Sequence, residues 1–292
     1  MKRSKELFAQ AGLLYSAAIW GSTFFLVKDA LNSISPFPLL AARFLLAAAL
    51  MLIVLKLMKK PPFSDLGKGL VIGVILFVVY LPQTIGLKFT TASNSGFITG
   101  LFIIFVPLMG WVLFRRVPER NKVLSVVLAL AGLWVLTGGP GKINLGDMLT
   151  LITAFAYSLH ILYAGRYMAE GADPYVITFQ QFLIVGILSL TGSLMEGNGG
   201  ELISGKVSGI IVFLAIFPTL LAFLVQMISQ KFTSPLKVAI IFSLEPVFAA
   251  LFAWNMGGEK FSAHRGLGGM IIVAAIMVSE IPSIKGHIRN SR

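Results

Sequence analysis

Residues Gln226 to Glu259 read QMISQKFTSPLKVAIIFSLEPVFAALFAWNMGGE, and residues Gln83 to Glu119 read QTIGLKFTTASNSGFITGLFIIFVPLMGWVLFRRVPE. Each stretch begins with Gln, reaches Lys-Phe-Thr five residues later, and continues as a long apolar segment with one matching proline, Pro246 or Pro107. The stretch from Gln83 carries about four extra residues, roughly one helical turn. A hydrophobic unit that occurs twice predicts an internally repeated membrane protein.

The composition predicts that most of the chain lies in lipid. Hydrophobic residues make up 57% of the 292 residues and charged residues only 12%, which is outside the range of soluble globular domains. The formal net charge of +12 comes from Lys and Arg clustered between apolar runs. This pattern indicates topology signals and contact with anionic lipid headgroups, and not nucleic-acid binding. The absence of cysteine excludes disulfides and thiolate metal sites.

Apolar runs recur at about 20 residues, the length that crosses a hydrocarbon core of roughly 30 Å. The first run follows the short basic segment 1–6, and we interpret it as a retained span and not a cleaved signal peptide. Gly69 and Gly73, four residues apart, are expected at a close helix contact. The runs lie near residues 7–27, 37–57, 69–87, 96–114, 123–138, 148–167, 175–195, 208–230, 236–256 and 266–282. The sequence therefore predicts an all-α integral membrane protein with ten transmembrane helices.

Charge and span number together predict the topology. With the N-terminus inside, 17 of the 24 Lys and Arg residues fall in inside segments and six in outside segments, so both termini are predicted to be cytoplasmic. Each copy contains five spans, an odd number, so equivalent helices cross the membrane in opposite directions. We expect two inverted five-helix repeats, residues 1–141 and 142–292. Such repeats allow a carrier to open to either side of a midplane site.

Four motifs carry a family resemblance. They are Trp20-Gly21-Ser22-Thr23 in the first span, Arg43 in the second, Gln-X-X-Gly-Leu-Lys-Phe-Thr-Thr at 83–91 and Ser-Leu-Glu-Pro-Val-Phe at 243–248. In combination they resemble the bacterial drug/metabolite transporter superfamily, in its ten-span EamA-type branch. The resemblance implies two EamA repeats, alternating access, and a central cavity lined mainly by the first, third, fourth, sixth, eighth and ninth spans. Relatives handle amino acids, other metabolites, dyes and drugs, so no single substrate is implied.

Glu245 is expected near mid-depth of the ninth span, where a charge costs about 2.5–3.5 kcal/mol on insertion scales. Pro246 follows it and predicts a bend, because proline removes a backbone donor from the helix. The carboxylate could bind protons or a cationic group in a cavity, or it could accept hydrogen bonds at the bend. Val106 occupies the matching place in the first copy, so the fold itself does not require the acid.

Two further ionisable residues lie within predicted spans. Arg43 could attract an anionic group through its planar fork, but the favoured interpretation is structural, with its stem packed on apolar neighbours. Its counterpart in the second copy is Gln181. His160 is the only histidine within an apolar run. It could couple protons to transport, or it could be neutral and bonded to a neighbouring helix.

The remaining candidates are uncharged. Gln83 and Gln226 match in the repeat alignment and could bind a ligand or clamp neighbouring helices by about 1 kcal/mol. Pro107, Pro246 and Arg43 are expected to have structural roles. The residues expected to contact substrate are Trp20, Thr23, Tyr80, Gln83, Asn94, Thr99, Tyr157, His160, Gln226 and Glu245.

The sequence lacks a phosphate-binding Gly-rich loop, a His-Glu-X-X-His motif and a nucleophile elbow. We therefore expect no enzymatic activity, cofactor or metal site. We interpret the chain as a secondary transporter of the cell inner membrane that exports a small metabolite such as an amino acid. Its expected partners are that substrate, the lipid bilayer and protons carried by Glu245 or His160. The alternatives are an exporter of drugs or lipophilic cations, with cation–π contacts, and a non-transporting scaffold.

Overall fold

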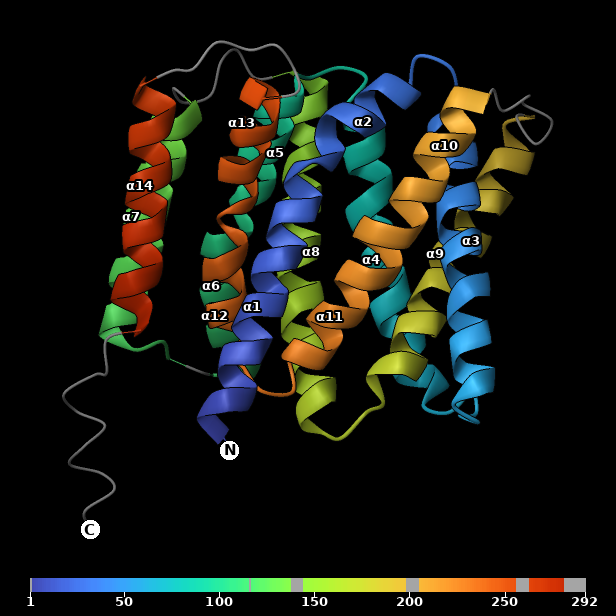
Figure 1. The fold of residues 1–292 in the computed structure, drawn as a ribbon, viewed down its shortest axis with the longest axis horizontal. Coiled ribbons are helices and arrows are strands. Elements are labelled where there is room, and N and C mark those ends of the chain that lie inside the picture. The colour runs from blue at the N-terminus through green and yellow to red at the C-terminus, as the bar shows by residue number, and fades with distance from the viewer. Residues whose placement is uncertain (1, 116, 138–143, 198–204, 256–262, 281–292) are drawn as a thin grey trace.

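The computed structural model describes residues 2–115, 117–137, 144–197, 205–255 and 263–280, and within these ranges every regular element is a helix. The helices form one bundle with roughly parallel axes (Figure 1). They are α1 (Lys2–Gly21), α2 (Thr23–Ala30), α3 (Pro36–Leu57), α4 (Leu66–Gly86), α5 (Ala92–Gly100), α6 (Phe102–Phe114), α7 (Arg120–Thr137), α8 (Leu145–Ala169), α9 (Pro174–Met195), α10 (Gly205–Leu214), the π-helix η1 (Ala215–Leu221), α11 (Ala222–Ser229), α12 (Pro235–Phe242), α13 (Glu245–Asn255) and α14 (Ala263–Glu280). The predicted all-helical class is confirmed.

Seven helical segments among the described residues are long and apolar enough to cross a membrane. They are Ser4–Ala30, Pro36–Leu57, Leu66–Gly86, Ser95–Phe114, Leu145–Ala169, Pro174–Met195 and Gly205–Ser229. Helices α7, α12 with α13, and α14 occupy the other three predicted places. The ninth is interrupted, and α7, α13 and α14 each end next to residues outside the described ranges. The predicted boundary between residues 141 and 142 also lies outside these ranges.

Within the described residues, four of the ten predicted spans are interrupted, namely the first, fourth, eighth and ninth. The sequence indicated an interruption only in the ninth. Between α12 and α13 the helix breaks at Ser243 and Leu244, two to three residues before Pro246, a proline that cannot donate to the Phe242 carbonyl. The break between α5 and α6 precedes Pro107 by one to two turns. Pro218 lies inside the π-helix η1, and π-helical turns occur frequently at functional sites. Proline thus marks three of the four interruptions.

The fourth interruption separates α1 from α2 at Ser22 and involves no proline. The Ser22 hydroxyl donates to the Ile19 carbonyl at 2.6 Å, and the Thr23 hydroxyl donates to the Trp20 carbonyl at 2.8 Å. Such side-chain bonds compete with the helical backbone pattern. They turn the end of the first segment towards the interior of the bundle.

Glycine permits the close approach of α4 to α9. A Cβ atom added at Gly69 would lie 2.7 Å from Gln180 Cβ, and one at Gly73 would lie 2.7 Å from Ile184 Cβ. The predicted close helix contact at these two glycines is confirmed. Helices α7 and α14 pack mainly against each other and form one flank of the bundle (Figure 1).

Aromatic side chains fill the centre of the bundle. The Trp20 ring lies 5.0 Å from the rings of Phe223 and Phe242 and 6.0 Å from that of Tyr157, measured between centroids. Phe102 lies 5.3 Å from Tyr157. Edge-to-face pairs of this kind contribute about 0.5–1.5 kcal/mol beyond their buried area. The cluster connects segments from both copies of the repeated unit.

The N-terminal edge is the end of the bundle where α1 begins, and it also holds the ends of α3, α6 and α8 (Figure 1). At this edge Lys60 forms an ion pair with Asp173. The Gln180 amide donates to the carbonyls of Pro62 and Ser64 at 2.9 and 2.7 Å. The loop between α3 and α4 is thereby attached to the start of α9.

Asp173 has a double role, since it also caps α9 by accepting from the backbone N–H groups of Tyr175 and Val176. Burial raises the pKa of the Asp173 carboxyl, but the hydrogen bonds from Lys60 and the backbone outweigh burial, so the net pKa lies below its ordinary value of 3.8. A carboxyl with a lowered pKa stabilises the fold above its ordinary pKa. This stabilisation is lost as pH falls through the lowered value.

We predict that Asp173→Ala lowers the free energy of unfolding by about 1–2 kcal/mol at pH 7, through loss of the cap and of a surface ion pair. Asp173→Asn keeps the cap acceptor and should cost about 0–1 kcal/mol. The difference between wild type and Asp173→Asn should vanish as the pH falls below 3.8. Thermal unfolding in detergent at several pH values measures this. Asp65→Asn is the control, because Asp65 makes no side-chain cap bond; an equal loss there would contradict the prediction.

Candidate functional site

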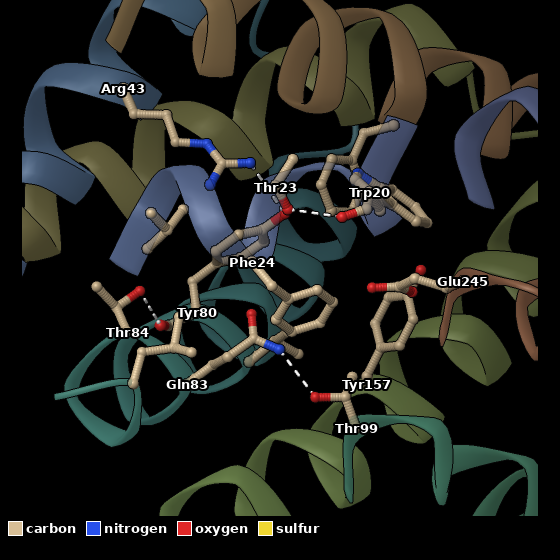
Figure 2. A pocket seen from close by; sticks show the side chains of 14 residues that line it. Trp20, Thr23, Phe24, Arg43, Tyr80, Gln83, Thr84, Thr99, Tyr157 and Glu245 are labelled. Atoms are coloured by element: carbon tan, nitrogen blue, oxygen red, sulfur yellow. Dashed lines mark hydrogen bonds between the residues drawn. The ribbon is translucent and has the colours of Figure 1, made fainter. Parts of the chain in front are cut away.

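A cavity of about 40 Å³, part of it open to the outside, lies mainly between the first and third spans, and the second, fourth, sixth, eighth and ninth spans each contribute one lining residue. Small-molecule sites usually measure roughly 300–1,000 Å³, so these side chains must move apart to admit a ligand. Fourteen residues line the cavity, namely Trp20, Thr23, Phe24, Val27, Arg43, Val79, Tyr80, Gln83, Thr84, Leu87, Thr99, Tyr157, Phe223 and Glu245. Figure 2 shows Arg43 and Glu245 on opposite sides of this cavity, with aromatic rings between them.

The π-helix η1 positions one wall of the cavity. Trp20 donates its indole N–H to the Pro218 carbonyl at 2.7 Å. The Thr219 hydroxyl donates to the Leu214 carbonyl at 2.6 Å. Carbonyls released by an irregular turn must find other donors within an apolar bundle. The indole supplies one of these donors, and its ring is held against the cavity as a result.

Arg43 is buried, with 3% of its surface exposed. Its Nε donates to the Thr219 hydroxyl at 2.6 Å, and its Nη2 donates to the Tyr80 hydroxyl at 3.3 Å. The guanidinium carbon lies 4.7 Å from the centre of the Tyr80 ring. A guanidinium has five N–H groups, and these two bonds use two of them. Arg43 was expected to be structural; the structure places it in the cavity wall as well.

Glu245 is the first residue of α13 and is 7% exposed. The described residues include no hydrogen-bond or ion-pair partner for its carboxylate. Gly21 makes this placement possible, because a Cβ atom there would lie only 2.7 Å from the Glu245 carbonyl oxygen. A buried carboxylate without a partner is unfavourable, so it is the group in this cavity most in need of a cation or a proton.

Aromatic rings surround the carboxylate. Figure 2 shows the Tyr157 ring reaching towards Glu245, with Trp20 nearby. The Tyr157 hydroxyl is buried and has no hydrogen-bond partner among the described residues. Phe223 completes this side of the wall. This side of the cavity can therefore offer a small ligand the negative charge of Glu245, the π faces of the aromatic rings and the unused hydroxyl of Tyr157.

The polar groups on the α4 and α5 side are partly occupied by each other. The Gln83 amide donates to the Thr99 hydroxyl at 2.9 Å. The Thr84 hydroxyl donates to the Tyr80 carbonyl at 2.7 Å, within the same helix. The amide oxygen of Gln83 has no partner among the described residues and remains available to a ligand.

Seven of the ten residues expected to contact substrate line the cavity, and three do not. His160 is fully buried behind the wall, with Nε2 at 2.9 Å from Gln181 Oε1, and its ring stacks on Tyr157 at 5.9 Å. Gln226 is fully buried and donates to Gln230 at 3.2 Å. Asn94 belongs to α5, but its side chain is outside the described part of the structure.

Sequence reasoning did not select six of the lining residues: Phe24, Val27, Val79, Thr84, Leu87 and Phe223. Four of them are apolar, and nothing in the sequence distinguishes an apolar residue that lines a cavity from one that contacts lipid. Thr84 follows Gln83 directly, and Phe223 lies three residues before Gln226 as Tyr80 lies three residues before the matching Gln83. These two could have been found from their neighbours.

A second and larger cavity, of about 500 Å³, lies at the N-terminal edge. We call this cavity, formed by the ends of α6 and α8 and the start of α12, the vestibule. Its apolar floor includes Val106 and Pro107, the residues that match Glu245 and Pro246. Its rim carries both charge signs, with Lys122 and Arg166 near Glu119 and Glu170. The two cavities thus lie towards opposite edges of the bundle.

A bundle of apolar helices with an internal polar and aromatic cavity defines a multi-pass membrane protein. The EamA-like transporter family model matches the chain twice, over residues 7–138 and 144–280. The chain therefore belongs to the EamA-like transporter family, and the predicted resemblance is confirmed.

Curated relatives have the same general function. An uncharacterized transporter of Archaeoglobus fulgidus is 34% identical over 274 residues, covering 94% of this chain and 86% of that protein. The uncharacterized transporter YyaM of Bacillus subtilis is 26% identical and covers 94% of each chain. The uncharacterized inner membrane transporter YedA of Escherichia coli is 26% identical, covering 95% and 92%. Transport is thus the function of this protein at the level its family defines.

A solved crystal structure supports the fold. It is 20% identical in sequence, has a TM-score of 0.80, and covers 95% of this chain and 96% of that chain.

We predict that Gly21→Val destabilises the protein by about 1–3 kcal/mol, since the added side chain would meet the backbone of α13 and has no space to occupy. Gly209→Val is the matched control, because a Cβ at Gly209 meets nothing within 4 Å. Thermal unfolding of both variants in detergent measures the effect. Equal unfolding midpoints would show that α1 and α13 do not depend on this contact.

Proposed function

We propose that the protein is a secondary transporter that exports a small metabolite, such as an amino acid, across the inner membrane by alternating access. The observation that carries the proposal is Glu245, a buried carboxylate without a partner among the described residues, in an aromatic-lined cavity with Arg43 on the opposite wall. A small zwitterion presents the two charges that complement this pair.

The proposed architecture is ten spans in two inverted repeats, residues 1–141 and 142–292, with both termini in the cytoplasm. Two separate matches to the family model support it. Two ion pairs also support this architecture. Lys68 pairs with Glu170 at the N-terminal edge, and Lys206 pairs with Asp29 at the opposite edge. Each joins the start of a third span in one copy to the end of a first span in the other.

Two observations support the orientation and the alternating access. The basic loops at 56–68 and 115–122 both lie at the N-terminal edge, which the positive-inside rule makes cytoplasmic. The vestibule of about 500 Å³ lies at that edge, and the cavity with Glu245, of only about 40 Å³, lies towards the other. Carriers of inverted repeats open to one side at a time. A wide cavity on one side and a narrow one on the other fit such a cycle.

The proposed chemistry uses the two charges separately. An ammonium group would bind Glu245, with π faces from Trp20 and Tyr157 adding cation–π attraction. The substrate carboxylate would bind the unused N–H groups of Arg43, whose position is maintained by Thr219 and Tyr80. When the ammonium leaves, a proton takes its place on Glu245, because an unpaired charge is costly there. This competition would couple substrate export to proton entry.

Uptake by proteoliposomes tests the proposal. Purified protein would be assayed with labelled amino acids and one lipophilic cation, with and without an imposed pH gradient. Saturable amino-acid uptake that responds to the gradient is the expected result. Uptake of no amino acid in the panel, with uptake of the cation, would favour the alternative function instead.

We predict that Glu245→Gln lowers gradient-driven uptake by at least about tenfold, since hydrogen bonds to charged groups contribute about 1.5–3 kcal/mol. Initial uptake rates at matched protein density measure this. Glu6→Gln is the control, because Glu6 pairs with Lys237 outside the cavity. A Glu245→Gln protein with the full pH response would exclude Glu245 as proton carrier. His160→Gln would then be the next variant, since His160 stacks on Tyr157.

The alternative function is export of drugs or lipophilic cations, for which the aromatic wall and Glu245 are sufficient. Arg43 separates the two functions, because a cation gains nothing from a guanidinium. We predict that Arg43→Gln lowers amino-acid uptake by about tenfold or more and leaves binding of a lipophilic cation unchanged or stronger. Competition between the two ligands, measured in wild type and Arg43→Gln, distinguishes them. Equal loss for both ligands would indicate that Arg43 only supports the fold.

A further inference from the structure

Helix α6 has one face on which the described part of the chain places no closely packed helix. Helix α7 follows it in sequence but packs mainly against α14 on the flank of the bundle (Figure 1). The face of α6 left open by this departure carries Leu108, 42% exposed, and Trp111, 56% exposed. Large apolar side chains at such exposure need a nonpolar cover, which in a membrane is lipid.

The open face borders a distinct cavity of about 320 Å³ between α6 and α7. We call it the α6–α7 groove and define it by Ile104, Leu108, Trp111, Lys122, Val123 and Val126. Of the ten residues that line it, Lys122 is the only one with a charge. The groove is therefore an apolar channel with a single cation at its end near the N-terminal edge.

Lys122 has no ion-pair or hydrogen-bond partner among the described residues. Arg115, directly after α6, and Arg120, the first residue of α7, are both exposed at the two ends of the short connection between these helices. Glu119 is the acidic residue of this connection, and it lines the vestibule and not the groove. The local balance is thus positive, and the cation that faces the groove forms no ion pair with the acidic residues of the described vestibule rim.

We infer that the α6–α7 groove binds an anionic phospholipid, with the phosphate at Lys122 and an acyl chain along Leu108 and Trp111. The groove offers one positive charge at the edge of the bundle and only apolar surface deeper in. A phospholipid presents the matching order of groups, a charged headgroup followed by hydrocarbon. A non-helical protein segment would bring backbone polar groups that the apolar part of the groove could not satisfy, and a helix would not place an anionic group beside Lys122 unless it carried an acidic side chain there.

The position of the groove gives the bound lipid a role. The groove and the vestibule share five lining residues, among them Pro107, Pro118 and Lys122. A lipid in the groove would form the lateral wall of the vestibule between α6 and α7. It would separate a polar cavity from the surrounding hydrocarbon at the point where no helix does so.

Fluorescence quenching of Trp111 tests the inference. The protein would be reconstituted in two sets of phosphatidylcholine liposomes. One set contains phosphatidylglycerol brominated on its acyl chains, and the other contains the same fraction of phosphatidylcholine brominated in the same way. The quenching lost in Trp111→Phe gives the share that belongs to Trp111. We define the preference as the ratio of Trp111 quenching by brominated phosphatidylglycerol to that by brominated phosphatidylcholine. A ratio of roughly five is expected, which corresponds to the attraction between one cation and an anionic lipid surface.

Substitutions at Lys122 assign the preference to this groove. Lys122→Gln should lower the quenching ratio to close to one, and Lys122→Arg should retain the wild-type ratio. Lys56→Gln is the matched control, an exposed lysine at the same edge on α3, and should behave as wild type. Equal quenching by both lipids, a preference that survives Lys122→Gln, or weak quenching by both lipids because protein covers the groove, would each overturn the inference.

Discussion

The hydrogen bond from the Trp20 indole to the Pro218 carbonyl connects the parts of the structure on which the cavity depends. Pro218 lies within a π-helical turn of the eighth span, and an apolar environment requires the carbonyls freed by this irregular turn to be satisfied within the protein. The indole supplies a donor at 2.7 Å, and Thr219 in the same turn holds Arg43 at 2.6 Å. One irregular turn therefore positions both the aromatic wall and the guanidinium.

The chemistry of the cavity lies where the two copies of the repeated unit differ. Glu245 stands where the first copy has Val106, and Arg43 stands where the second has Gln181. Gln181 is neutral and bonded to His160, which lies behind the wall. Each copy thus contributes one charge that the other lacks. The shared residues, Pro107 and Pro246 above all, accompany interrupted helices, and a broken helix can bring backbone and side chains close to a cavity.

The candidate site could be predicted where a residue type is costly in lipid, and less well elsewhere. Glu245 was identifiable because a carboxylate is rare in an apolar span and usually faces a cavity or the bundle interior. Gln83 and Gln226 match in sequence, yet Gln83 lines the cavity and Gln226 bonds to Gln230 inside the bundle. The helix face that each presents cannot be read from the chain, since lipid and protein interior are both apolar. Val79 and Leu87 remained undetected for the same reason.

The class of the protein can be read from the chain alone, because long apolar runs require helices in lipid and the repeated stretch indicates an internally repeated unit. Glu245 can be read from the chain as well, because its charge is exceptional among apolar neighbours. Three features appear only in the folded protein: Arg43 and Glu245 share one cavity, Gly21 lets α1 reach the backbone of α13, and among the described residues α7 leaves one face of α6 uncovered. These features depend on how helices far apart in the chain pack together. Hydropathy reports the transfer of each residue into an apolar medium and contains no information on that packing.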